Sequence, residues 1–272
     1  MCLHECKIGA IRLLLQDRLL LLEQLVWHSC LQLALQCGQH GVSSDTDSVR
    51  PDPVQPNPDR KALKKLGEQV SERLDADPEA YRVPVDKAEL FAIADFLTQA
   101  ECTRMMAMID DVARPSELFD EAYDDKYRTS YSGDVDSADS FVRMIERRLS
   151  DLIGIDISWG ESVQGQRYEP GQEFREHCDW FHTTADYWKS EIKRGGQRSW
   201  TAMVFLNEVE QGGETEFPNL GVRFPPQAGA LLVWNNAAAD GKPNDETLHS
   251  ALPVERGVKY VITKWFRTRP WS

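Results

Sequence analysis

The C-terminal part of this chain consists of short apolar runs separated by turn residues. The runs lie at 162–168, 199–207, 214–217, 229–235 and 258–267, with Gly, Pro and Asn between them. Runs of this length and punctuation are typical of antiparallel strands and not of long helices. The pattern therefore predicts a mainly β fold, built as a sandwich or a barrel.

Helices are expected before and beside these strands. Apolar residues recur at three- and four-residue steps in 138–152, and a further helix is expected at 99–113. A short polar helix is expected at 61–75, after a stretch rich in Pro and Ser. We divide the chain into an amphipathic helical extension at 1–40, a Pro/Ser-rich linker with the short polar helix at 41–76, a helical support at 77–156 and a β domain at 157–270.

The first 40 residues are rich in leucine, with a spacing that favours an amphipathic helix. Arg12, Asp17, Arg18 and Glu23 interrupt the stretch, so neither a membrane span nor a secretory signal is expected. Three interpretations stay open: packing on the rest of the chain, pairing with a second copy, and a misassigned translation start. The oligomeric state is open as well.

Charge and cysteine usage narrow the cellular setting. The formal net charge is −13 and the sequence pI is near 5.0, which argues against nucleic acid and anionic membranes as partners. The cysteines at positions 2, 6, 30, 37, 102 and 178 lack the dense, regular spacing of a disulfide-stapled secreted module. We therefore expect reduced thiols and a cytoplasmic protein.

A candidate metal site lies in the β domain. His177 and Asp179 are two residues apart, so in an extended segment both side chains project to one side while Cys178 points away. With His249 they make two imidazoles and one carboxylate, the facial triad that binds Fe(II) and leaves other coordination positions open. A zinc site of a hydrolase is compatible with the same ligands.

The segments around these residues match one known family in order and spacing. They include Gly-Gly-Gln-Arg at 195–198, Gly-Gly-Glu-Thr-Glu at 212–216, and the stretches around His177, His249 and Lys259. Upstream matches are 95–102 and Arg-Thr-Ser at 128–130. In these segments, over about residues 88–270, the chain resembles the catalytic domain of the prolyl 4-hydroxylase alpha-subunit family, within the 2-oxoglutarate and Fe(II)-dependent dioxygenases.

The resemblance implies a fold, cofactors and site residues. The fold is a double-stranded β-helix, or jelly roll, with flanking helices and here an N-terminal helical extension. The cofactors are Fe(II), 2-oxoglutarate as cosubstrate, O2, and ascorbate as reductant. The family places the metal on His177, Asp179 and His249, with no further catalytic residue. It places the cosubstrate against Lys259, Thr215, Tyr168 and Thr201, and the substrate against Arg198, Trp265 and Phe174.

The strand that carries Lys259 agrees with this assignment. A buried carboxylate is costly without a cationic partner, so a lysine with a hydroxyl beside it is the expected anchor for the cosubstrate. Alternation along 258–267 places Lys259 and Trp265 on one face and Lys264 on the other.

We expect hydroxylation of a prolyl residue in a protein or peptide, with release of succinate and CO2. Two departures from the family leave the substrate open, because Phe174 and Phe205 stand where relatives have tyrosine and each removes one hydroxyl. Hydroxylation of a free amino acid or small metabolite is the alternative. From another class, a non-catalytic jelly-roll binding module predicts a damaged triad or a missing basic anchor, and a zinc hydrolase gives no reason for Lys259.

Overall fold

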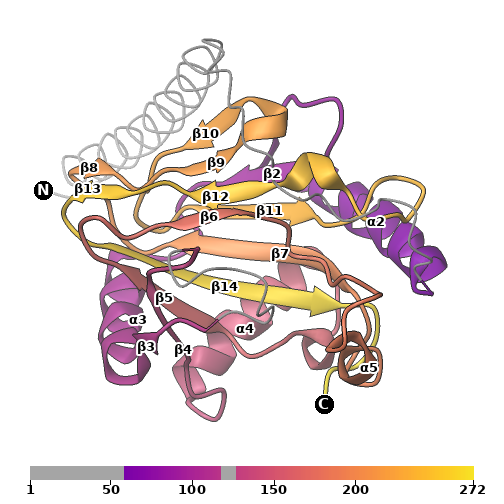
Figure 1. Ribbon diagram of the computed structural model, residues 1–272, viewed down its shortest axis with the longest axis horizontal. Coiled ribbons are helices and arrows are strands. Elements are labelled where there is room, and N and C mark those ends of the chain that lie inside the picture. The colour runs from indigo at the N-terminus through magenta and orange to yellow at the C-terminus, as the bar shows by residue number, and fades with distance from the viewer. Residues whose placement is uncertain (1–57, 118–126) are drawn as a thin grey trace, which may run out of the picture. The chain divides into compact units, whose positions relative to one another are not determined.

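Antiparallel sheets form the body of the protein in this computed structural model, which describes residues 58–117 and 127–272 (Figure 1). In sheet order, the strands of the large sheet are β1 (Ala80–Arg82), β2 (Leu90–Ile93), β11 (Leu231–Asn235), β7 (Arg198–Phe205), β14 (Lys259–Arg267), β5 (Gln164–Tyr168), β4 (Tyr131–Asp134) and β3 (Arg114–Pro115). The smaller sheet has β10 (Val222–Phe224), β9 (Thr215–Phe217), β12 (His249–Ala251) and β6 (Phe174–His177). A separate pair joins β13 (Val254–Arg256) to β8 (Gln211–Gly212).

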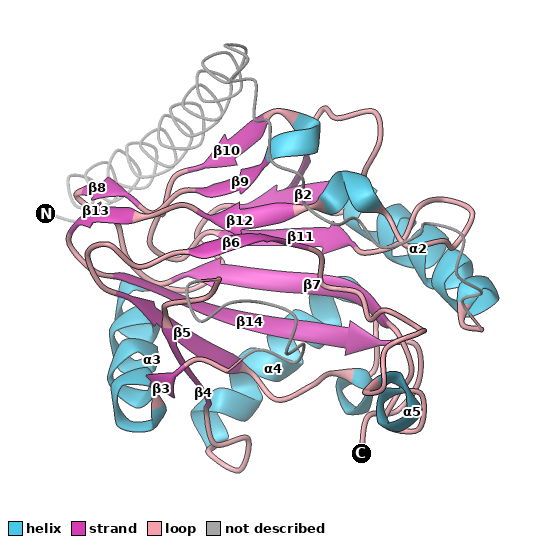
Figure 2. Cartoon of the chain, viewed as in Figure 1, coloured by secondary structure: helices cyan, strands magenta, loops and turns pink. Residues whose placement is uncertain are grey.

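Helices accompany the sheets (Figure 2). They are α2 (Arg60–Asp75), α3 (Gln99–Val112), α4 (Ser140–Ile153) and the short α5 (Trp188–Glu191), with 3-10 turns η1 (Ile157–Trp159), η2 (Pro218–Leu220) and η3 (Asp245–Thr247). The two larger sheets face each other across the pocket described below. This is the mainly β, jelly-roll core with flanking helices that the sequence predicted. The helical extension expected at 1–40 lies outside the described residues.

The two long helices begin and end at residues that favour helix termini. Thr98 caps α3, where its side chain and that of Glu101 each bond the other's backbone N–H in a capping box. Asp139 caps α4, and Gly154 ends it in the left-handed conformation at φ 77°. These signals explain why the helices expected at 99–113 and 138–152 have nearly the predicted bounds.

The short polar helix expected in the linker is α2, and one side of it belongs to the core. Leu63, Val70 and Leu74 are almost fully buried, and Val70 and Leu74 join the main apolar cluster of the protein. Burial of three leucine and valine side chains contributes about 1.5–3 kcal/mol each. The helix is therefore a packed part of the described body and does not act as a spacer.

The central strands β7 and β14 separate the helix side of the large sheet from the pocket side. Trp200 and Val204 of β7 and Ile262 and Phe266 of β14 join the apolar cluster formed with the helices. Alternate residues of β14, among them Lys259 and Trp265, line the pocket on the other face. The alternation predicted for this strand is thus confirmed.

Two further sequence expectations concern membranes and thiols. No helix within residues 58–117 and 127–272 is long and apolar enough to cross a membrane. Cys102 and Cys178 are free cysteines. The cytoplasmic location stays a prediction.

Lys264 lies on the helix side of β14, where it is buried and paired with a carboxylate. Its Nζ lies 2.8 Å from Oε1 of Glu146 on α4 and donates a second bond to the backbone oxygen of Glu161 at 2.7 Å. Both side chains of the Lys264–Glu146 pair are almost fully buried. Removal of one member leaves the other as an unpaired charge in a low-dielectric interior.

We predict that Lys264→Met destabilises the protein by about 3–5 kcal/mol because Glu146 loses its partner. The double variant Lys264→Met/Glu146→Leu should recover most of that loss, since no charge then stays buried. Urea unfolding of the two variants and the wild type measures the difference. Equal stability of the single and double variants would contradict this account of the pair.

Candidate active site

A pocket lies between the two facing sheets, with about 430 Å³ of empty space that includes the open solvent at its mouth. Side chains from both sheets and from the preceding loop line it: Arg128, Gln166, Tyr168, Phe174, His177, Asp179, Met203, Thr215, Trp234, His249, Ser250, Ala251, Lys259, Val261, Thr263 and Trp265. The predicted metal triad and the predicted lysine, Lys259, are both among these lining residues.

His177, Asp179 and His249 come together as the sequence predicted. Strands β6 and β12 pair so that His177 and His249 are direct neighbours, with ring centroids 4.3 Å apart. One ligand atom from each of the three residues lies within 4.8 Å of the other two. Asp179 differs from the expectation in its backbone, because β6 ends at His177 and the aspartate sits in the bend that follows.

The hydrogen bonds of both imidazoles select the tautomer that a metal needs. Nδ1 of His177 lies 2.8 Å from the backbone oxygen of Arg175, and Nδ1 of His249 lies 3.0 Å from that of Thr247. A carbonyl only accepts, so each Nδ1 carries the proton and each Nε2 keeps its lone pair. Backbone carbonyls thus orient both rings for metal binding.

The charges of the triad agree with this assignment. Burial, aided by the neighbouring His249, lowers the pKa of His177 to about 3, so its ring is neutral near pH 7. Burial alone would raise the pKa of Asp179, but His249 and His177 outweigh that effect and hold the pKa below its ordinary value. Two neutral imidazoles and a carboxylate are the donor set of a facial triad.

Thr201, which we expected beside the cosubstrate, is used elsewhere. Its hydroxyl donates to Oδ2 of Asp179 at 2.8 Å and accepts from Nδ2 of Asn236 at 2.9 Å. Thr201 is fully buried and does not line the pocket. It therefore orients the aspartate ligand instead of meeting the cosubstrate. Sequence analysis did not single out Asn236, which has no motif of its own.

Lys259 is a buried cation, and within the described residues no carboxylate lies at ion-pair distance from it. Only 1% of the residue is exposed, and its Nζ donates to the hydroxyl of Thr215 at 3.3 Å. The rings of Tyr168 and Phe205 lie 5.3 and 5.5 Å from the nitrogen. Burial lowers the pKa of Lys259 to about 7, against a smaller opposite effect of Glu214. Such a site fits a ligand that brings its own carboxylate.

Tyr168 lines the pocket next to Lys259, as expected, but its hydroxyl already has a partner. It donates to Oε1 of Gln166 at 2.7 Å, and the amide of Gln166 donates to Thr263 at 3.2 Å. Burial raises the pKa of Tyr168, so the phenol stays protonated. Gln166 and Thr263 are pocket residues that the motif comparison did not reveal.

Arg198 does not face the pocket, although we expected it to meet the substrate. It makes two bonds to Glu161, at 2.6 and 2.7 Å, and is almost fully buried. Its guanidinium lies 3.9 Å from the ring centroid of Trp265, which does line the pocket. The structure thus assigns Arg198 the task of fixing the Trp265 indole.

Phe174 lines the pocket and stacks on a metal ligand. Its ring centroid lies 3.6 Å from that of His177, with an angle of 14° between the planes. The guanidinium of Arg128 lies 4.8 Å from the same ring and donates to Gln164 at 2.9 Å. Sequence reasoning placed Arg128 in a matched segment, but not in the site. Its position in Arg-Thr-Ser is the one signal by which the sequence could have revealed it.

Comparisons with known proteins agree with this geometry. Residues 163–267 match the model of the 2OG-Fe(II) oxygenase superfamily. Probable prolyl 4-hydroxylase 3 of Arabidopsis thaliana is 30% identical over 231 residues, which cover 75% of each chain. Prolyl 4-hydroxylase 5 of the same plant is 32% identical over 204 residues, covering 65% of this chain and 68% of the plant protein.

Among solved structures, the viral collagen prolyl hydroxylase of Paramecium bursaria Chlorella virus-1, in complex with 2OG, has a similar fold. The TM-score is 0.52 and the identity 26%, over 65% of this chain and 95% of the viral chain. The triad, the buried lysine and these relatives lead to one conclusion. This chain belongs to the prolyl 4-hydroxylase-like enzymes of the 2OG-Fe(II) oxygenase superfamily, which use Fe(II) and 2-oxoglutarate.

Proposed function

We propose that this enzyme hydroxylates prolyl residues of a protein or peptide and releases succinate and CO2 from 2-oxoglutarate. The observation that carries the proposal is Lys259, a buried cation that shares one pocket with the triad. A hydrolytic metal site needs no such cation, whereas a dicarboxylate cosubstrate needs it for its far carboxylate. The named relatives are prolyl 4-hydroxylases, which supports proline as the target.

Different residues of the chain would bind the iron and the cosubstrate in this reaction. Iron and 2-oxoglutarate, when bound, supply the oxidising power that inserts one oxygen atom of O2 into a C–H bond. His177, Asp179 and His249 would hold the iron, and Lys259 with Thr215 would hold the cosubstrate. The apolar part of the lining, Phe174, Met203, Trp234 and Trp265, would keep water from the reacting atoms. Ascorbate as reductant and the absence of nucleic-acid substrates stay predictions.

A free amino acid or small metabolite is the second candidate substrate. The observation in its favour is Phe174, which presents a ring without a hydroxyl to the pocket. Arg128 beside it supplies a cation that a small carboxylate could use. The two candidates share the iron chemistry and differ only at this wall of the pocket.

His177→Ala and His249→Ala should each abolish the conversion of 2-oxoglutarate to succinate. Each variant leaves only two protein ligands, which are too few to hold the iron. Succinate formation with and without a prolyl peptide, measured by mass spectrometry, is the test. His182→Ala removes a histidine that does not line the pocket and should keep the activity. Full activity of either ligand variant would exclude the proposed metal centre.

The affinity for 2-oxoglutarate should weaken above pH 7. Lys259 has a pKa of about 7 in the free pocket, so it is mostly neutral at higher pH and must gain a proton when the carboxylate binds. The dissociation constant should then rise up to about tenfold per pH unit, and binding should take up a proton at about pH 8 but far less at about pH 6.

Calorimetry in buffers of different ionisation enthalpy measures this proton uptake. The matched control is Lys259→Arg, which stays charged at both pH values and should bind without taking up a proton. Equal uptake by the wild type at the two pH values would show that Lys259 does not meet the carboxylate.

The substrate class is decided by offering prolyl peptides and free proline to the same enzyme. We expect a mass gain of one oxygen atom on a prolyl residue of the peptide, with succinate in equal amount. Phe174→Tyr should raise the rate on peptides, since it restores a hydroxyl at the wall of the pocket. Hydroxylation of free proline alone would replace the proposal by the second candidate.

A further inference from the structure

Asp179 is the one triad member whose backbone no strand pairing holds. His177 and His249 are neighbours in the β6–β12 pair, so the register of the sheet fixes both. Asp179 follows the end of β6 and begins the segment that leads to α5. A ligand in a bend needs another support, because metal sites require their donors within a few tenths of an ångström.

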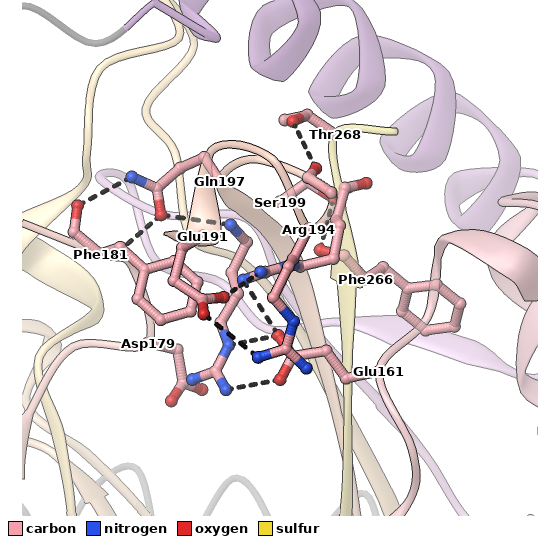
Figure 3. Close-up of polar contacts among 12 residues, drawn as sticks. Glu161, Asp179, Phe181, Glu191, Arg194, Gln197, Ser199, Phe266 and Thr268 are labelled. Carbon is pink, nitrogen blue, oxygen red and sulfur yellow. Dashed lines mark hydrogen bonds and ion pairs between the residues drawn. The ribbon is translucent and has the colours of Figure 1, made fainter. Parts of the chain in front are cut away.

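Gln197 provides such a support by bonding to Phe181, which lies two residues after Asp179 in the sequence (Figure 3). Its Oε1 accepts from the backbone N–H of Phe181 at 2.6 Å, and its Nε2 donates to the backbone oxygen of Phe181 at 2.8 Å. The side chain thus pairs with Phe181 as a neighbouring strand would. Gln197 is only 1% exposed, so neither bond competes with water.

Asp59 fixes the backbone of Gln197 in turn. Its Oδ2 accepts from the backbone N–H of Gln197 at 2.8 Å and from the hydroxyl of Thr268 at 3.0 Å. Its Oδ1 accepts from Arg269 at 2.6 Å, and the side chain is 7% exposed. Asp59 immediately precedes α2 and lies more than a hundred residues before the matched region, which begins at residue 163.

Gly196 shows that the close approach of Asp59 is built into the sequence. A Cβ at this position would lie 2.4 Å from Oδ2 of Asp59 and 2.5 Å from the hydroxyl of Thr268. The backbone of Gly196 also has a positive φ of 75°. Any other residue would push the carboxylate away from Gln197, which accounts for glycine here.

The ring of Phe181 gives the segment a second hold. The guanidinium groups of Arg198 and Arg267 lie 4.8 and 4.6 Å from its centroid. Glu161 pairs with both arginines, and Arg267 also contacts Glu191 of α5. The chain from Asp179 to Phe181 is therefore fixed through both the backbone and the side chain of Phe181.

We propose that Asp59 and Gln197 form a clamp that positions Asp179 for iron binding. The inference rests on the proposed function, since it concerns the same metal centre. Asp59 and Gln197 touch neither the metal nor the substrate, so they are positioning residues. The clamp also makes the start of α2 a working part of the catalytic unit, although it lies outside the matched region.

Co(II) titration tests the clamp without relying on turnover, because Co(II) binds to the same type of ligands as Fe(II) and gives a visible absorption spectrum. Gln197→Leu removes both bonds to Phe181. Asp59→Asn removes the charge and leaves one acceptor oxygen for donors that two oxygens now accept, so its NH2 group faces a donor on one side. Each variant should raise the Co(II) dissociation constant about tenfold, the lower end of effects from outer-shell partners. The double variant should be no weaker than the weaker single variant, because both act through one path.

Thr98→Ala is the matched control, because it breaks the capping box of α3 without touching the clamp. It should lower the melting temperature and leave the Co(II) dissociation constant within twofold of the wild type. A clamp with a purely structural role predicts the same for Gln197→Leu and Asp59→Asn, and that result would overturn the inference alone. Failure of the wild type to bind Co(II) would instead overturn the proposed function, and the inference with it. If Gln197→Leu does not fold, Asp59→Asn decides.

Discussion

The alternation of side chains along β14 is the constraint on which the rest of the structure depends. The strand is central in the large sheet, and it packs against helices on one face and lines the pocket on the other. A shift of register by one residue would move Lys259 out of the pocket and Lys264 into it. The ion pair between Lys264 and Glu146 of α4 opposes that shift, because the shift would break it. The buried Lys264–Glu146 pair thus helps to fix the register that places Lys259 in the pocket.

The two lysines of β14 also show how stability and function divide between the faces. Each is about 1% exposed, but Lys264 has a carboxylate partner and Lys259 has only the hydroxyl of Thr215 among the described residues. Burial lowers the pKa of both lysines; Glu146 opposes the effect at Lys264, whereas the pKa of Lys259 falls to about 7. A carboxylate ligand offsets the cost of burying the Lys259 cation when it binds. Under the proposed function, binding of 2-oxoglutarate would thus relieve a free-energy cost that the fold already bears.

Local pattern and motif were enough to predict that His177, His249 and Lys259 share one pocket. Alternation gave the face of Lys259, and motif spacing pointed to His177 and His249, whose cross-strand pairing follows from the fold. Contacts between distant segments were beyond such reasoning. The sequence of a two-residue or three-residue strand does not distinguish it from a turn. No local sequence signal indicates that Thr201 bonds to Asp179 or that Arg198 bonds to Glu161. These pairings exist only after the sheets have formed.

Side chains at the wall of the pocket bear on how substrate choice can change. Arg198 was expected at the substrate and instead fixes Trp265, so a residue one step behind the pocket controls the shape of its wall. Phe174 likewise meets both the pocket and His177. A substitution at such a wall can alter the substrate while the triad keeps its geometry, because the carbonyls that orient the imidazoles belong to the backbone. Strand pairing and the clamp therefore position the metal ligands. The side chains that stack at the wall of the pocket, Trp265 and Phe174, determine which substrate fits.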